Sequence, residues 1–256
     1  MALDLAATEL GSGPPLLILH GLFGSGRNWA AIAKALAETH RVLLVDLRNH
    51  GASPWADAMS YPEMAADVLA FIRGKQLGSV ALMGHSMGGK AAMLAALAEP
   101  ARIARLVVVD VAPVPREPAL LPYVQAMGAI DLTRVTRRTE VDPQLAAAVP
   151  SPAERAFLLQ NLVIEDGKAS WRINLPVLER DMPDIAGFPE DLPAASYPAP
   201  ALFVAGAKSD YIRPQDEPAI RRLFPEAEIV RIPGAGHWVH AEAPEAFVAA
   251  VKPFLA

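Results

Sequence analysis

Residues 80–92 read VALMGHSMGGKAA, an apolar run that stops at Gly84 and an alanine-rich run that begins after Gly88. The pattern predicts a strand, a tight turn and a helix, with Ser86 on the turn. The five residues of the turn match G-x-S-x-G, in which both glycines let strand and helix approach closely. The first N–H groups of such a helix favour a developing negative charge beside the serine. The stretch therefore predicts a nucleophilic serine at position 86.

Strand-like and helix-like segments alternate on both sides of this turn. Continuous apolar runs of the kind that a sheet buried on both faces requires occur at residues 15–19, 41–46, 106–111, 201–205 and 229–232. Segments with helical spacing of apolar residues separate most of these runs. The alternation predicts an α/β fold with a mostly parallel sheet covered by helices on both faces. Ligands of such sheets bind beyond the carboxyl ends of the strands, where Ser86 is expected to lie.

Residues 113–197 interrupt the alternation. This segment is rich in proline and contains helix-like pieces and a candidate hairpin at residues 162–173, whose centre is Glu-Asp-Gly-Lys. Its apolar content is too high for a disordered linker. We expect a mainly helical cap, or lid, inserted into a core formed by residues 1–112 and 198–256.

Composition restricts the chemistry and the partners. The chain has 256 residues, 52% of them hydrophobic, a net charge of −5 and no cysteine. The missing cysteines exclude disulfides, thiolate nucleophiles and cysteine-based metal sites. Scattered charges without a basic cluster argue against a nucleic-acid partner. The start of the chain does not resemble a secretory signal, and no stretch is long enough for a membrane span, so we expect a cytoplasmic protein. The oligomeric state is not predicted.

A serine hydroxyl needs a neighbouring base, and histidine is the usual one. Of the six histidines, His85 is adjacent to Ser86, where neighbouring side chains point apart. His237 lies in the loop Gly-Ala-Gly-His-Trp after the last core strand, where it can reach over the sheet edge. We therefore predict His237 as the base, with His240 as its rival. A metal held by this pair is not expected, because the spacing lacks a further ligand.

The third member of such a constellation is an acid that orients the histidine. Two aspartates compete, and both satisfy the chain order Ser, Asp, His. Asp210 follows the apolar run ALFVAG, and Asp110 ends the run RLVVVD. Asp210 is favoured at this point, and Asp110 remains the alternative.

The chain resembles the α/β-hydrolase superfamily, and more narrowly the YbfF-type esterases. The broad resemblance covers the whole chain, and the narrower one depends on six segments: HGLFGS (20–25), DLRNHG (46–51), GHSMGGK (84–90), DVAPV (110–114), WRINLPVL (171–178) and AGHWVHAE (235–242). It implies Ser86 as nucleophile, His237 as base, and an oxyanion hole from the backbone N–H groups of Met87 and Leu22, with Phe23 as the alternative donor. It leaves the acid ambiguous.

We therefore expect a serine hydrolase that cleaves carboxylic esters, or acyl thioesters, through an acyl-enzyme and without a cofactor. The substrate is expected to be a small molecule with an apolar acyl part, in contact with Phe23 and Trp238. A small-molecule receptor of the same fold with very slow turnover is one alternative. A cofactor-free haloperoxidase or perhydrolase is the other.

Overall fold

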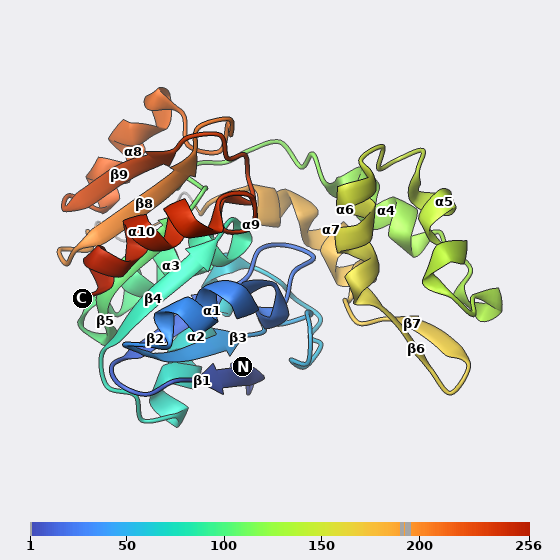
Figure 1. The fold of residues 1–256 in the computed structure, drawn as a ribbon, viewed down its shortest axis with the longest axis horizontal. Helices are drawn as coiled ribbons and strands as arrows, with labels where there is room; N and C mark the ends of the chain where they lie inside the picture. Colours follow the sequence, from blue (N-terminus) through green and yellow to red (C-terminus); the bar gives the residue numbers. More distant parts are fainter. Residues whose placement is uncertain (1, 190–191, 193–195) are drawn as a thin grey trace.

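A computed structural model describes residues 2–189, 192 and 196–256 (Figure 1). Residues 190–191 and 193–195, which belong to the expected cap, lie outside the described residues. The main sheet has seven strands in the order β1-β3-β2-β4-β5-β8-β9, and all of its pairs are parallel except β1 with β3. These strands are β1 (Ala7–Leu10), β2 (Pro15–Leu19), β3 (Arg41–Val45), β4 (Val80–His85), β5 (Ile103–Val109), β8 (Ala201–Gly206) and β9 (Ala227–Ile232).

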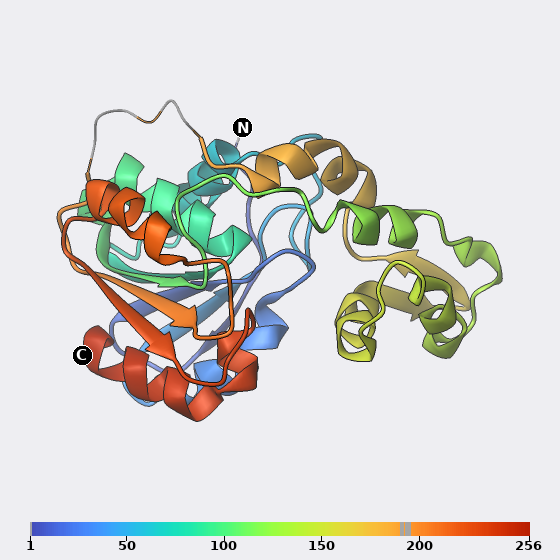
Figure 2. The ribbon, with the colours of Figure 1, turned by 90° about the horizontal axis from the view of Figure 1, so that it is seen from above.

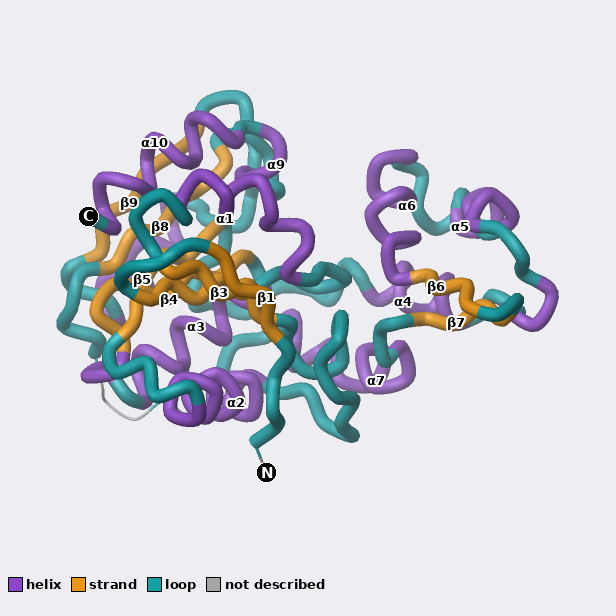
Figure 3. Tube along the Cα trace, turned by 60° about the horizontal axis from the view of Figure 1, so that its bottom comes forward, coloured by secondary structure: helices purple, strands orange, loops and turns teal. Residues whose placement is uncertain are grey.

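Helices cover both faces of the sheet, as the apolar strands require (Figure 3). Because side chains alternate along a strand, Leu16 and Ile18 of β2 pack toward α1 and α10, whereas Leu17 and Leu19 pack toward α2 and α3. The helices around the sheet are α1 (Ala30–Leu36), α2 (Tyr61–Gly74), α3 (Met87–Ala98), α8 (Glu217–Leu223), α9 (Val239–Glu242) and α10 (Pro244–Leu255). The expected fold class is confirmed.

The end of β5 differs from the sequence prediction in a way that matters for the site. The run expected at 106–111 lies in β5, but β5 ends at Val109 because Asp110 has a φ of 51° and leaves the strand conformation. The backbone of Asp110 still continues the register, since its N–H donates to the carbonyl of Val204 in β8 at 2.9 Å. Because of this change in backbone conformation, the Asp110 side chain no longer follows the alternation of β5 at the carboxyl edge of the sheet.

The segment between β5 and β8 lies outside the main sheet and projects to one side of it (Figures 1 and 2). It contains helices and the predicted hairpin, in the order α4 (Leu121–Gly128), α5 (Asp142–Leu145), α6 (Pro152–Leu158), β6 (Leu162–Glu165), β7 (Lys168–Trp171) and α7 (Leu175–Ala186). Short 3₁₀ turns complete the chain: η1 (Gly26–Trp29), η2 (Pro100–Arg102), η3 (Leu132–Arg134), η4 (Arg138–Glu140), η5 (Leu159–Asn161) and η6 (Pro214–Asp216). The expected boundaries near residues 113 and 197 fall in the two connections to the sheet.

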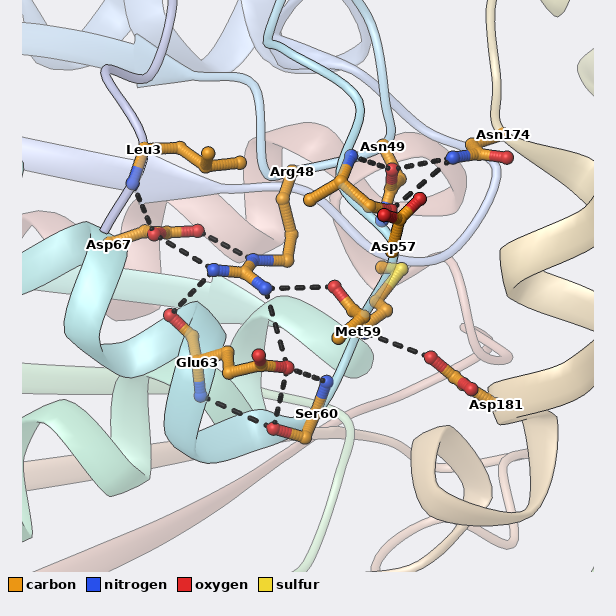
Figure 4. Close-up of polar contacts among 12 residues, drawn as sticks. Leu3, Arg48, Asn49, Asp57, Met59, Ser60, Glu63, Asp67, Asn174 and Asp181 are labelled. Atoms are coloured by element: carbon orange, nitrogen blue, oxygen red, sulfur yellow. Dashed lines mark hydrogen bonds and ion pairs between the residues drawn. The ribbon is translucent and has the colours of Figure 1, made fainter. Parts of the chain in front are cut away.

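The loop between β3 and α2 is held by a buried ion pair (Figure 4). Arg48 Nε donates to Asp67 at 2.7 Å, and the side chains of both residues are almost fully buried. Asp67 also accepts the N–H of Leu3 at 2.7 Å. Ser60 and Glu63 form a capping box that begins α2, with the Ser60 N–H 3.1 Å from the Glu63 carboxylate. The ion pair of Arg48 thus anchors the DLRNHG segment to α2.

Helix α7 joins the inserted segment to this same loop. The Asn174 N–H donates to the carbonyl of Asn49 at 3.1 Å, and the Asn174 amide donates to the Asn49 side chain at 3.0 Å. Further along the helix, Asp181 accepts the N–H of Met59 at 2.9 Å (Figure 4). The first and middle turns of α7 are therefore fixed to the core. In the described part of the chain, no helix is both long and apolar enough to cross a membrane.

Candidate active site

Ser86 lies on the predicted turn between β4 and α3. Its φ of 52° and ψ of −119° are strained for a residue with a side chain. A Cβ on Gly84 would lie 2.2 Å from the Gly88 carbonyl oxygen, and one on Gly88 would lie 2.4 Å from that of His20. Both positions therefore require glycine, because a side chain would prevent the close approach of strand and helix that the sequence predicted. The turn presents the Ser86 hydroxyl at the carboxyl edge of the sheet.

A chain of hydrogen bonds runs from Ser86 through His237 to Asp110. His237 Nε2 lies 3.1 Å from Ser86 Oγ, and His237 Nδ1 lies 2.8 Å from Asp110 Oδ2. An ionised aspartate can only accept, so Nδ1 carries the proton and Nε2 is left to accept the hydroxyl proton of Ser86. The sequence predicted the first two residues of this chain.

The acid in this hydrogen-bonded chain is Asp110, the alternative from the sequence, and the favoured Asp210 lies outside it. The Asp110 side chain is fully buried, whereas that of Asp210 is 88% exposed and faces Arg213 at 3.9 Å. Asp110 follows β5 directly, but Asp210 lies four residues beyond the end of β8, on a loop that carries it outward. Both lie after adjacent strands at the same edge, which is why chain order did not separate them.

Two further donors contact the Asp110 carboxylate. The Gly206 N–H donates to Oδ1 at 2.9 Å, and the Ser209 hydroxyl donates to Oδ2, which also accepts from His237. Charge-assisted hydrogen bonds of this kind stabilise the ionised form. Sequence reasoning missed Ser209, although it is the serine of the Gly-Ala-Lys-Ser-Asp segment in which Asp210 was chosen. Its hydroxyl, rather than the next residue's carboxylate, contributes to the site.

The backbone around His237 is held by contacts from three elements. The His237 carbonyl lies 2.9 Å from Nε2 of His85, so His85 donates to it from the end of β4. Tyr211 stacks on the His237 ring at a centroid distance of 3.9 Å. A Cβ on Gly206 would lie 2.0 Å from the Gly236 carbonyl oxygen, so glycine is needed where β8 passes under the loop. These contacts orient the His237 ring toward Ser86.

His240, the rival base, lies elsewhere. It is buried and stacks on Trp29 at a centroid distance of 3.9 Å. Burial, with a smaller contribution from His237, lowers the pKa of His240 to about 3, so it is neutral. Its ring, on α9, contacts Trp29 of η1 and Phe247 of α10, whereas His237 is hydrogen-bonded to Ser86.

The Leu22 and Phe23 loop is fixed by contacts on both sides. The Phe23 N–H donates to Nε2 of His50 at 3.3 Å, and the Phe23 carbonyl accepts the side-chain amide of Asn161 at 2.8 Å. Within the described residues, no hydrogen bond uses the N–H of Leu22. The N–H of Met87 is the first of α3 and has no partner inside the helix. Leu22 and Met87 therefore keep donors beside Ser86, whereas the donor of Phe23 is engaged.

His50 explains part of the DLRNHG segment. Burial is the main reason that the pKa of His50 is lowered, to about 3, with the neighbouring His20 adding to the effect. The neutral ring donates from Nδ1 to the Arg48 carbonyl at 3.0 Å and accepts from Phe23. The segment thus links the loop that binds α7 to the loop that carries Leu22.

Two cavities meet at Ser86. One extends past Met87 between α3, α7 and the start of the inserted segment, and its lining includes Tyr61, Lys90, Arg116 and Met182. The second has His237 in its wall and extends beneath α6. Its apolar lining includes Phe23, Leu120, Tyr123, Phe157, Leu158 and Trp238. Phe23 and Trp238, the expected substrate contacts, therefore both line the cavity on the His237 side.

Lys90 and Tyr211 line the first cavity but were not predicted as site residues. Lys90 is the last residue of the quoted GHSMGGK segment, and its position four residues after Ser86 on one helix was a usable signal. Tyr211 follows Asp210 in a loop, where no periodicity indicates a direction. Among the described residues, no cluster of three or more histidine, aspartate or glutamate side chains is arranged to hold a metal.

Comparison with known proteins gives a consistent picture. A family model described as alpha/beta hydrolase fold matches residues 14–244. The chain is 45% identical over 251 residues to the sn-1-specific diacylglycerol lipase ABHD11 of Xenopus laevis. The aligned region covers 95% of this chain and 80% of that protein. It is 37% identical over 246 residues to esterase YbfF of Escherichia coli, covering 94% and 92% of the two chains.

A solved structure is also very similar. The structure of a marine microorganism esterase matches with a TM-score of 0.96 and 40% identity, over 99% of this chain and 100% of that one. The resemblance to YbfF-type esterases that the sequence motifs indicated is confirmed.

Proposed function

The chain belongs to the α/β-hydrolase family, and from this premise we propose that it cleaves carboxylic esters through an acyl-enzyme formed on Ser86. The observation that carries the proposal is the hydrogen-bonded chain from Asp110 through His237 to Ser86. It supplies a nucleophile, a base and an acid that keeps the base in the required tautomer. Relatives that are named esterases and lipases support the same class of reaction.

In the first half of the reaction Ser86 Oγ attacks the ester carbonyl carbon while His237 Nε2 takes its proton. The imidazolium that forms is stabilised by the buried Asp110 carboxylate. The tetrahedral intermediate then collapses, the bond to the alcohol oxygen breaks, and His237 gives its proton to that oxygen. An acyl-enzyme and a free alcohol result.

In the second half a water molecule replaces the alcohol. His237 removes a proton from the water, the hydroxide attacks the acyl carbon, and the Ser86 oxygen leaves with the proton that His237 returns. The acid is released and the enzyme is restored. A thioester would react by the same steps, with a thiol as the leaving group.

The negative charge on the carbonyl oxygen is expected to be stabilised by the N–H groups of Leu22 and Met87. The free donor of Leu22 and the position of Met87 at the start of α3 support this pair. Phe23 is the weaker candidate because its N–H already donates to His50.

Replacing Ser86 with Ala tests the proposal directly. We expect the turnover of p-nitrophenyl esters to fall by roughly 10⁴-fold to 10⁶-fold, because the acyl-enzyme cannot form. Reaction of the wild-type protein with a fluorophosphonate should label Ser86 stoichiometrically and abolish turnover. Activity retained by Ser86→Ala would contradict the proposal. Stoichiometric labelling with negligible turnover across ester and thioester panels would instead favour a small-molecule receptor.

A further inference from the structure

The two cavities at Ser86 receive different halves of an ester, an inference that rests on the proposed function. The alcohol oxygen must reach His237 Nε2 to receive its proton, so the alcohol lies on the side where His237 lines the wall. The acyl chain then extends the other way, past Met87 and into the cavity that Lys90 and Arg116 line. That cavity sets the preference for the acid part of the substrate.

A buried lysine lies in the wall of this acyl cavity. Lys90 is on α3, four residues after Ser86, and only 3% of the residue is exposed. Its Nζ donates to the carbonyls of Ala186 at 2.8 Å and Gly187 at 2.5 Å, at the carboxyl end of α7. An ammonium group has three donors, so one remains for a ligand. The ring of Tyr61, 5.6 Å from Nζ, closes another side.

Among the described residues, the charge of Lys90 has no counter-ion. In the described part of the chain no carboxylate forms an ion pair with Nζ. Arg116, the other cation of the cavity, is paired with Asp216 and also donates to the Tyr211 carbonyl. Glu117 lines the same cavity, but this residue is exposed, and among the described residues it forms no ion pair with Lys90. A buried cation with no anion is costly unless a bound molecule supplies one.

The protonation behaviour of Lys90 agrees with this picture. Burial, together with the positive charge of Arg116, lowers the pKa of Lys90 to about 7. The group is therefore partly charged near neutral pH. An anion bound beside it would favour the protonated form and bring the pKa back up.

We propose that Lys90 determines the acyl specificity of this enzyme by binding a carboxylate at the far end of the acyl chain. The substrates would then be monoesters or monothioesters of short dicarboxylic acids. A short chain is required because Lys90 is about one helical turn, roughly 6 Å along the axis, from Ser86. The apolar side chains of Leu22, Met87, Val111, Met182 and Ile185 line the space for the methylene groups.

The test compares ethyl monoesters of malonic to adipic acid with neutral ethyl esters of equal chain length. At pH 6.5 we expect wild-type kcat/KM to favour the best monoester over its neutral counterpart by roughly tenfold or more, mainly through KM, as a charge-assisted hydrogen bond would provide. Lys90→Met should bring this ratio to one or below, and Lys90→Arg should retain a preference. The ratio should also fall as the pH rises above 7, because Lys90 then loses its proton.

Arg180→Gln is the matched control. Arg180 is exposed on α7 and donates to the Asp57 carbonyl, so its loss weakens the attachment of α7 without removing a charge from the cavity. The ratio should not change in this variant. If Lys90→Met does not fold, as judged by circular dichroism and thermal melting, the wild-type panel and its pH dependence still decide.

Two results separate this proposal from the proposed function. A wild-type enzyme that hydrolyses neutral esters equally well or better overturns the role of Lys90 and leaves ester hydrolysis intact. Equal ratios in wild type and a folded Lys90→Met variant do the same. Failure to hydrolyse either class of ester would instead overturn the proposed function.

Discussion

Strands β5 and β8 are neighbours in the sheet, and an aspartate follows each of them, but the two residues have opposite surroundings. Asp110 continues directly from β5, is fully buried and hydrogen-bonds to His237. Asp210 comes after a loop and is 88% exposed. The comparison shows that the strand end contributes a carboxylate only if the chain turns inward at once, as the φ of 51° at Asp110 does. Distance along the chain from a strand is therefore more informative than chain order.

Within this comparison of the two aspartates and their neighbours, the largest expected effect comes from Asp110→Asn. An amide cannot stabilise the His237 imidazolium and does not enforce the Nδ1–H tautomer, so kcat should fall by about 10⁴-fold. Steady-state kinetics on p-nitrophenyl esters measures it. Because Asp110 is buried, circular dichroism and a melting curve must show that the variant is folded. Near-normal turnover in a folded variant would show that Asp110 is not needed for catalysis, although it is the aspartate that contacts His237.

Ser209→Ala should have an intermediate effect. It removes one hydrogen bond from Asp110 Oδ2 and leaves the carboxylate in place, so we expect kcat/KM to fall by roughly tenfold. Ser209→Thr keeps the hydroxyl and serves as the control. An unchanged kcat/KM in Ser209→Ala would mean that the Ser209 hydroxyl does not contribute to the action of the Asp110 carboxylate.

Asp210→Asn should have the smallest effect. The Asp210 side chain is exposed and its contact with Arg213 is a surface ion pair, for which less than about 1 kcal/mol is expected. We expect kcat and KM within about twofold of wild type under the assay used for Asp110→Asn. A loss as large as that of the Asp110 variant would restore the original preference for Asp210.

A similar contrast applies to the amide donors. Leu22 and Phe23 are adjacent, and the sequence offered either as the second donor beside Met87. The Phe23 N–H is engaged by His50, which comes from a distant loop. This contact depends on the DLRNHG segment and on Asn161 of the inserted segment, which holds the Phe23 carbonyl. No pattern within residues 20–25 contains that information.

The sequence by itself determined the sheet, the turn at Ser86 and the position of His237. These features depend on local properties: apolar strands with helices between them, two glycines around a strained residue, and a glycine-rich loop after the last strand. Each of these features can be predicted from residues that are close together in the sequence. The spacing of apolar residues and the backbone freedom of glycine are both local properties.

Only the tertiary structure decided which aspartate meets His237. The same holds for two features of the described residues: which amide of the Leu22 loop has no hydrogen-bond partner there, and that Lys90 is buried with no counter-ion among them. Each of these depends on where a side chain or an N–H group points after strands and loops from distant parts of the chain have packed together. Asp110 and Asp210 both follow apolar strands and satisfy the same chain order, and what separates them in space is the direction in which the backbone leaves the sheet edge.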